Sequence, residues 1–318
     1  MKYVTNRLLY LIPTLVLVSM IIFVLMRVLP GDVATLMLVG PEGTGTPTEE
    51  QIANLNAQLG LDRPLPVQYL DWMSGMMRLD AGTSFWTGQP VFSELFRRLP
   101  LTLELGIITT FIGTGLAIPL GVIAAVKRGS WIDYTSRIFA IGGLSVPSFW
   151  AGILIILALV KFFGWTAPLG YSGPFEDPAA NFSQMIWPAL ALGYSHAALV
   201  SRLVRSSLLE VLREDYIRTA RSKGLKESKV IAGHALRNSM LPVITVIGLG
   251  LANIFGGTVV METVFSLPGV GRFMVDAINH HDFPIVQTLT FMFAIIYAVM
   301  NLAVDLSYGV LDPRIRLA

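Results

Sequence analysis

Long apolar runs without Asp, Glu, Lys or Arg recur along the chain. A helix needs about 20 mostly apolar residues to cross the roughly 30 Å of hydrocarbon in a bilayer. Six such runs are present, at residues 8–26, 105–126, 138–160, 182–201, 238–261 and 283–304. We interpret the first as a retained helix, because no Ala-x-Ala signal-cleavage pattern follows it. The pattern predicts an all-α integral membrane protein with six transmembrane helices.

The positions of Lys and Arg predict how these helices are oriented, because cytoplasmic loops carry the excess of basic residues. Sixteen of the 23 Lys and Arg residues fall on one side of the six runs, in segments 1–7, 127–137, 202–237 and 305–318. Of the remainder, Arg27 lies at the edge of the first run, and the short segments on the opposite side hold only Lys161 and Arg272. Both termini are therefore predicted to be cytoplasmic.

The segment at residues 30–98 is too long to be a bare connection between helices. Thr48 and Gln51 form a capping-box pattern, and Gly60 follows where a helix would end. A second helix is expected to begin after Pro66. We predict a small external helical cap here, with a disordered linker as the alternative. The predicted domains are thus an N-terminal segment with the first transmembrane helix (1–29), the cap (30–98) and a five-helix core (99–318).

The segment at residues 202–237 holds nine basic and four acidic residues on the predicted cytoplasmic side. The spacing of Ile217 and Ala220, and of Tyr216 and Ala220, places these three on one face of a short helix. Gly224 then ends that helix. The pattern is typical of a docking helix for a cytoplasmic partner, and the alternative is a basic loop that only enforces topology.

Composition excludes several classes of function. Only 14% of residues are charged, against about 25% in an ordinary soluble domain, and the chain has no Cys. No thiol nucleophile or Cys-ligated metal is therefore present. None of the six Lys residues follows a Gly, so the chain contains no P-loop. A net charge of +2 without a basic, aromatic-interleaved stripe argues against nucleic acid as a partner.

A few polar side chains fall within or beside the predicted helices. The candidates for lining a transport pathway are Ser145, Ser148, His196, Asn253 and Thr258. For His196 a packing hydrogen bond is the alternative. For Glu104 we expect a local ion pair with Arg97 or Arg98. The adjacent His280 and His281 make a poor chelate, and we expect a solvated pair there rather than a metal or substrate site.

Several motifs resemble one family of membrane proteins. They include RLLYLIPTLVLVSMIIFVLMRVLPGD at the N-terminus, RLPLTLELG, GGLSVPSFW, LREDYIRTARSKGL, METVFSLPGVGRFMVDAI and the closing VDLSYGVLDPRIR. In order and over essentially the whole chain, they resemble the permease subunits of ATP-binding-cassette importers of the dipeptide, oligopeptide and nickel type. The resemblance implies a type I importer permease fold in the bacterial inner membrane.

The resemblance also implies partners and a docking site. A second, homologous permease subunit would complete the pathway, two cytoplasmic ATPase subunits would bind ATP and Mg²⁺, and an extracytoplasmic protein would deliver the substrate. This chain would need no cofactor and perform no catalysis. Arg218 stands where the family's EAA motif has Glu, which is a departure from the general consensus. The implied ATPase-coupling helix comprises Asp215, Tyr216, Ile217, Arg218, Thr219, Ala220, Arg221, Lys223 and Gly224.

Two other classes of function remain as alternatives. A self-sufficient secondary transporter or channel would work without ATPase subunits, although it would usually carry a buried carboxylate or His relay. An intramembrane enzyme would need a nucleophile and a base, for which Ser195 and His196 are the nearest pair. The substrate stays open among dipeptides, longer peptides, nickel chelates, glutathione and other small solutes.

Overall fold

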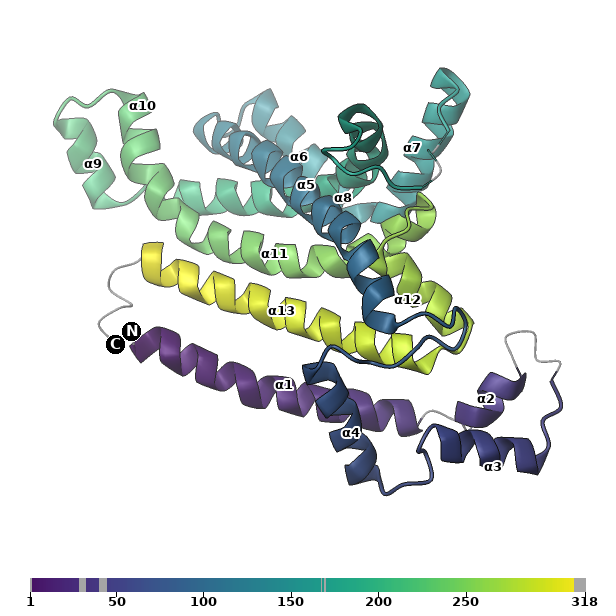
Figure 1. Ribbon diagram of the computed structural model, residues 1–318. Coiled ribbons are helices and arrows are strands. Elements are labelled where there is room, and N and C mark those ends of the chain that lie inside the picture. Colours follow the sequence, from purple (N-terminus) through teal and green to yellow (C-terminus); the bar gives the residue numbers. More distant parts are fainter. Residues whose placement is uncertain (1, 29–32, 40–44, 167, 169, 312–318) are drawn as a thin grey trace. The chain divides into compact units, whose positions relative to one another are not determined.

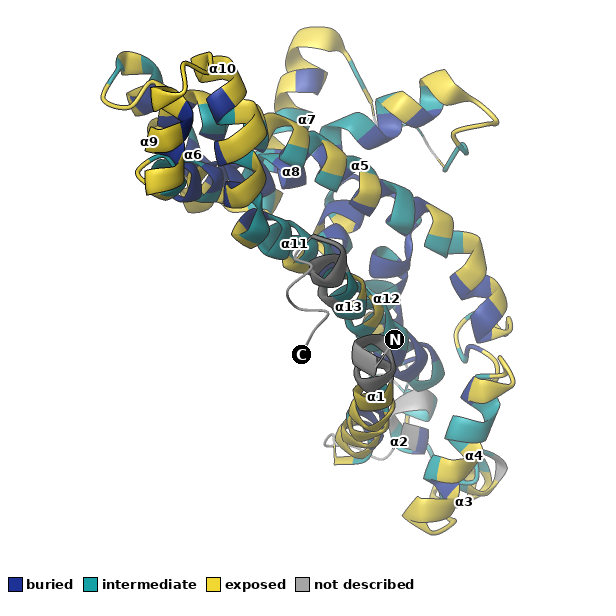
Figure 2. Cartoon of the chain, turned by 90° about the vertical axis from the view of Figure 1, so that its left-hand side faces the viewer, coloured by how far each residue is buried: buried dark blue, intermediate teal, exposed yellow. Residues whose placement is uncertain are grey.

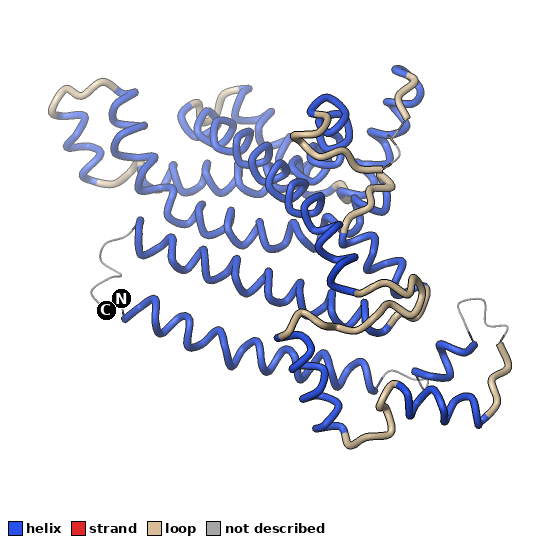
Figure 3. The backbone as a smooth tube through the Cα atoms, viewed as in Figure 1, coloured by secondary structure: helices blue, strands red, loops and turns tan. Residues whose placement is uncertain are grey.

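The computed structural model describes residues 2–28, 33–39, 45–166, 168 and 170–311, and its elements are helices throughout these ranges (Figures 1 and 3). In chain order they are α1 (Lys2–Val28), α2 (Val33–Val39), α3 (Glu49–Gln58), α4 (Leu65–Met77), α5 (Val91–Val126), α6 (Trp131–Ser145), α7 (Ser148–Phe163), α8 (Pro178–Val211), α9 (Asp215–Ser222), α10 (Glu227–Lys229), a π-helical turn η1 (Val230–Ala235), α11 (Leu236–Val264), α12 (Val270–Asn279) and α13 (Phe283–Leu311). The predicted all-α class is confirmed.

The chain divides into two compact units. The first comprises residues 1–102 and 268–298, and the second comprises residues 103–267 and 299–318. This division differs from the domains expected from the sequence, because residues 268–298 belong to the first unit rather than to the expected 99–318 core. The expected boundary between residues 98 and 99 and the observed one between residues 102 and 103 both fall inside the continuous helix α5. The other expected boundary, between residues 29 and 30, lies outside the described residues.

Four helical stretches are long and apolar enough to cross a membrane: Leu9–Val28, Val91–Val126, Glu227–Val264 and Phe283–Val304. They correspond to the first, second, fifth and sixth predicted spans. The third predicted span, 138–160, is not one helix, because α6 and α7 meet at an angle of 101°. Val146 is extended there, since a residue before proline avoids the helical region and Pro147 has no N–H to donate. Counting the bent pair as one span gives five.

The fourth predicted span is part of α8, which is not among these apolar stretches. Helix α8 packs against α6, α7 and α11, so protein rather than lipid covers much of its surface. Polar residues on it are therefore tolerated at membrane depth. The close approach of α5 to α8 depends on glycine, because a Cβ at Gly121 of α5 would lie 2.6 Å from the carbonyl oxygen of Ser201.

The first unit has its own apolar core and a lipid-type surface. Residues of α1, α4, α5, α12 and α13 share that core, with Leu95, Phe273 and Leu289 among its most buried members. On its other side α1 exposes a continuous set of large apolar side chains, which appears yellow in Figure 2. An apolar face of this kind without a protein partner is suited to lipid contact.

Local sequence signals fix the helices of the predicted cap. Thr48 Oγ1 accepts a hydrogen bond from the Gln51 N–H, and the Thr48 N–H donates to Gln51 Oε1 at 2.9 Å. This reciprocal pair satisfies two N–H groups that a helix start otherwise leaves free. Gly60, at φ +64°, ends the turn in a left-handed conformation that glycine adopts without strain. The predicted helix start at Thr48 and the second helix near Pro66 are confirmed.

Candidate functional site

The short helix α9 lies between α8 and α11, where the sequence predicts a helix. It comprises Asp215–Ser222, with Lys223 as its last capping residue and Gly224 at φ +75°. Asp215 at the first turn and Arg221 at the last complement the helix dipole. Figure 1 shows α9 beside α10, and both contact η1 at the start of α11.

One face of α9 anchors it to the rest of the second unit. Ile217 is fully buried and Ala220 nearly so. They share an apolar cluster whose other buried members are Ala125, Leu208, Val230 and Ala235. Tyr216 was expected on the same face but is 42% exposed, and its hydroxyl accepts a hydrogen bond from Asn238 Nδ2 at 2.8 Å. Helix α9 is thus held on this side by an apolar contact and by a hydrogen bond at its edge.

The opposite face of α9 is charged and exposed. Arg218 pairs with Asp215 at 3.2 Å, and Arg221 makes two hydrogen bonds to Glu227, at 2.6 and 3.1 Å. These hydrogen bonds raise the pKa of Arg221. Thr219 and Lys223 are also exposed. An anchored helix with a charged outer face can bind a partner and transmit its displacement as a rigid body.

The five candidate pathway residues differ in exposure. His196 and Thr258 are buried, and Thr258 Oγ1 donates to the Phe255 carbonyl of its own helix at 2.8 Å. Ser145 and Asn253 are exposed, and Ser148 is half-buried. Ser145 and Ser148 flank the bend between α6 and α7.

His196 is tightly enclosed. Its Nε2 lies 3.3 Å from Thr114 Oγ1. A Cβ at Gly113 would lie 2.8 Å from the imidazole, and one at Gly250 would lie 2.7 Å from it. Glycines of α5 and α11 therefore make room for the ring of an α8 residue. Within the single chain this geometry matches the packing hydrogen bond rather than an open pathway.

An ion pair that the sequence analysis missed joins α6 to α8. Arg205 donates two hydrogen bonds to the carboxylate of Asp133, at 2.7 and 2.9 Å. The Gly129 N–H donates to the same carboxylate, and the side chain of Asp133 is only 2% exposed. A bidentate arginine–carboxylate pair fixes relative orientation as well as distance. The two residues are 72 positions apart, so no local spacing reveals the pair.

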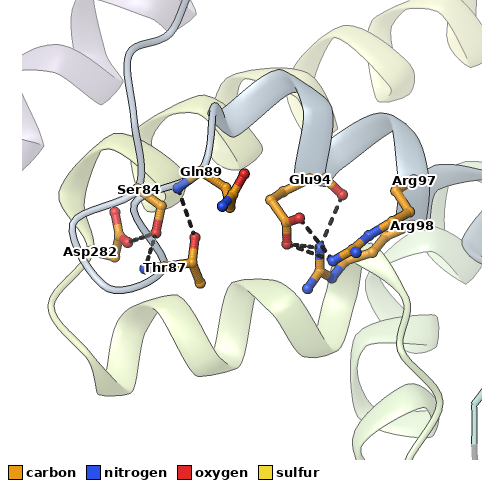
Figure 4. Close-up of polar contacts among 7 residues, drawn as sticks. All are labelled: Ser84, Thr87, Gln89, Glu94, Arg97, Arg98 and Asp282. Atoms are coloured by element: carbon orange, nitrogen blue, oxygen red, sulfur yellow. Dashed lines mark hydrogen bonds and ion pairs between the residues drawn. The ribbon is translucent and has the colours of Figure 1, made fainter.

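A second polar cluster lies in the first unit (Figure 4). Asp282 is fully buried at the start of α13, and it accepts hydrogen bonds from Ser84 Oγ at 2.6 Å and from the Trp86 N–H at 3.1 Å. The two histidines expected to be a solvated pair are each half-buried. His280 stacks on Trp86 with ring centroids 4.0 Å apart, and His281 Nδ1 is buried.

The expected ion pair of Glu104 is also wrong. Arg97 and Arg98 pair instead with Glu94, which is three and four residues earlier on the same helix (Figure 4). Glu104 accepts a hydrogen bond from the Tyr171 hydroxyl at 2.5 Å. Burial and this hydrogen bond raise the pKa of Tyr171, so the hydroxyl remains a donor. Arg97 and Arg98 pair with Glu94 because residues three and four positions apart lie on the same face of a helix.

Glu262 is a further residue that sequence reasoning missed. It is fully buried near the end of α11, one position beyond the charge-free run that ends at Met261. Counting charge-free runs treats such a residue as a boundary rather than as part of the helix. A buried carboxylate in a membrane helix is a feature that ion-driven carriers use. The alternative function as a self-sufficient secondary transporter therefore needs a direct test.

The chain matches two family models, which together cover most of its length. Residues 117–317 match the binding-protein-dependent transport system inner membrane component, and residues 1–106 match the N-terminal part of the membrane component of such systems.

Named relatives match over nearly their full length. The dipeptide transport system permease protein DppB of Escherichia coli strain K12 is 40% identical over 342 residues, with 99% of both chains covered. The probable peptide ABC transporter permease protein y4tP of Sinorhizobium fredii is 39% identical over 314 residues, again with 99% of both chains covered.

Solved structures show the same fold at low identity. The MetNI methionine ABC transporter in an inward-facing conformation matches with a TM-score of 0.56 at 18% identity, over 69% of this chain and 96% of that one. An amino acid ABC transporter solved with histidines matches with a TM-score of 0.50 at 16% identity, over 70% and 94%. The fold is that of type I importer permeases. The chain therefore belongs to the binding-protein-dependent transport system inner membrane component family, and it is a multi-pass inner membrane permease subunit of an ABC importer.

Proposed function

We propose that this chain forms half of a transmembrane pathway for peptides or similar small solutes, and that a homologous permease subunit forms the other half. The relatives named as peptide and dipeptide permeases support this substrate class. The five candidate pathway residues include two exposed polar side chains, Ser145 and Asn253, that a second subunit can cover. An extracytoplasmic binding protein delivers the substrate.

Helix α9 is the proposed ATPase-coupling element. The observation that carries this assignment is the two-sided character of the helix: Ile217 and Ala220 are buried, while Arg218 and Arg221 present charge outward. Two cytoplasmic ATPase subunits bind ATP and Mg²⁺ themselves and displace α9 when they close. Because Ile217 anchors α9 to a cluster formed by the ends of α5 and α8 and by η1, which leads into α11, that displacement reaches the membrane helices.

The same assignment predicts the topology, with both termini and α9 in the cytoplasm and α3 outside. Because the natural chain has no Cys, single cysteines give a clean readout. Arg218→Cys on α9 is expected to cross-link to an ATPase subunit and to resist a membrane-impermeant maleimide in intact cells. Glu50→Cys, exposed on α3, is the matched control. It is expected to react with the maleimide and to form no such cross-link, and the reverse pattern would refute the assignment.

A further inference from the structure

An open cavity of about 370 Å³ in the first unit is lined by the end of α1, the segment between α3 and α4, α4 itself, the loop after it and the start of α13. The lining includes Arg27, Trp72, Phe85 and Gln287. The volume is within the range of small-molecule sites, which are mostly apolar with a few placed polar groups. This composition matches that description.

Arg27 contributes a cation that has no acidic partner among the described residues. Its Nε donates to Gln68 Oε1 at 2.9 Å, and the guanidinium lies 4.9 Å from the centre of the Phe23 ring. Gln68 is itself held by two hydrogen bonds, to the carbonyl oxygens of Leu61 and Arg63. The guanidinium is thus oriented by a fixed amide, and its two terminal nitrogens remain available for a planar anion.

Gln287 contributes an unused donor. The residue is only 6% exposed, and its Nε2 is buried with no hydrogen-bond partner. Leaving a buried donor unpaired costs about 1–3 kcal/mol, so its presence beside a cavity points to a group that binds there. Two carboxylates of the same unit do not accept this hydrogen bond, since Asp71 pairs with Arg63 and Asp282 accepts from Ser84.

We propose that this cavity binds a small carboxylate-bearing solute of about dipeptide size. The carboxylate pairs with Arg27, and the Gln287 amide turns toward the cavity so that its Nε2 donates to a carbonyl oxygen. An apolar side chain of the solute packs on Trp72 and Phe85. The inference rests on the proposed peptide transport, because it gives the same class of solute a second site outside the pathway between the subunits.

The test uses the complete importer complex, purified through this chain, in nanodiscs of phosphatidylcholine without binding protein. The probe is N-acetyl-phenylalanine, and its uncharged amide is the control ligand, with affinities measured by calorimetry. We expect the acid to bind and the amide to bind at least about tenfold more weakly, since a hydrogen bond to a charged group is worth about 1.5–3 kcal/mol.

Three variants locate the probe. Arg27→Gln is expected to weaken binding of the acid at least about tenfold. Gln287→Leu removes only the unused donor, so the complex should remain as stable to heat as the wild type while losing affinity. Arg78→Gln, exposed on the same unit, is the matched control and should change nothing. Unchanged affinity in both Arg27→Gln and Gln287→Leu would overturn the site.

Two further measurements distinguish a solute from a lipid headgroup in the cavity, and the cavity proposal from the proposed transport function. If added phosphatidylglycerol displaces the probe, the cavity holds a lipid headgroup and the solute proposal is wrong. ATP-driven peptide uptake by the same complex in liposomes reports the proposed function independently. Uptake without probe binding would overturn the cavity proposal alone, whereas failure of uptake would count against the transport role.

Discussion

Ile217→Asp is expected to abolish ATP-driven uptake by the reconstituted importer. Ile217 is the fully buried centre of the contact that holds α9, in a cluster with Leu208 and Val230. Removing the apolar side chain and placing a carboxylate there costs at least about 4 kcal/mol of local docking free energy. Helix α9 would then detach, and closure of the ATPase subunits would no longer move the membrane helices. Uptake should fall more than about 100-fold.

The conservative variant Ile217→Val is the control, because it keeps the apolar contact and costs only about 0.5–1.5 kcal/mol. It should retain most of the uptake. Co-purification of the ATPase subunits and their rate of ATP hydrolysis are measured in the same preparations. Normal uptake by Ile217→Asp would show that α9 does not couple the two processes.

Asp133→Ala is expected to cause the largest loss of stability. The change leaves the Arg205 side chain, which is 22% exposed, without the carboxylate that it grips with two hydrogen bonds. Breaking a buried ion pair by removing one partner costs about 3–5 kcal/mol. The midpoint of thermal unfolding in detergent, followed by tryptophan fluorescence, should fall by about 6–15 °C.

Two further variants test whether the loss of stability comes from the unpaired charge of Arg205. Arg137→Ala removes a half-exposed arginine 3.8 Å from the same carboxylate, and it should cost no more than about 1 kcal/mol. The double variant Asp133→Leu with Arg205→Met replaces both charges by apolar groups and should recover most of the lost stability. If the double variant is as unstable as Asp133→Ala, the cost lies in lost shape rather than in an unpaired charge.

The features that the sequence predicts well are those set by neighbouring residues. The helix start at Thr48 and the helix end at Gly60 follow from capping chemistry within a few positions. Helix α9 follows from the spacing of Ile217 and Ala220 and from the glycine at 224. Four of the six apolar runs identify helices long and apolar enough to span, because the backbone of each such helix satisfies its own hydrogen bonds in the bilayer.

The features that the sequence leaves open depend on contacts between distant segments. Asp133 and Arg205 meet only because α6 packs on α8, and Tyr171 reaches Glu104 from a loop 67 positions away. A count of charge-free residues does not detect a bend, so the run across Pro147 was predicted as one helix. The charge-poor composition likewise gave no sign that Glu262 is fully buried.

In the proposed mechanism, the energy for transport comes from ATPase subunits rather than from this chain. The most direct measurement is uptake of a labelled dipeptide into liposomes, with the complete importer and with this chain alone. Uptake is expected only when the complete importer, its binding protein and ATP are all present. Uptake by this chain alone, driven by a proton or sodium gradient and abolished by Glu262→Gln, would contradict it.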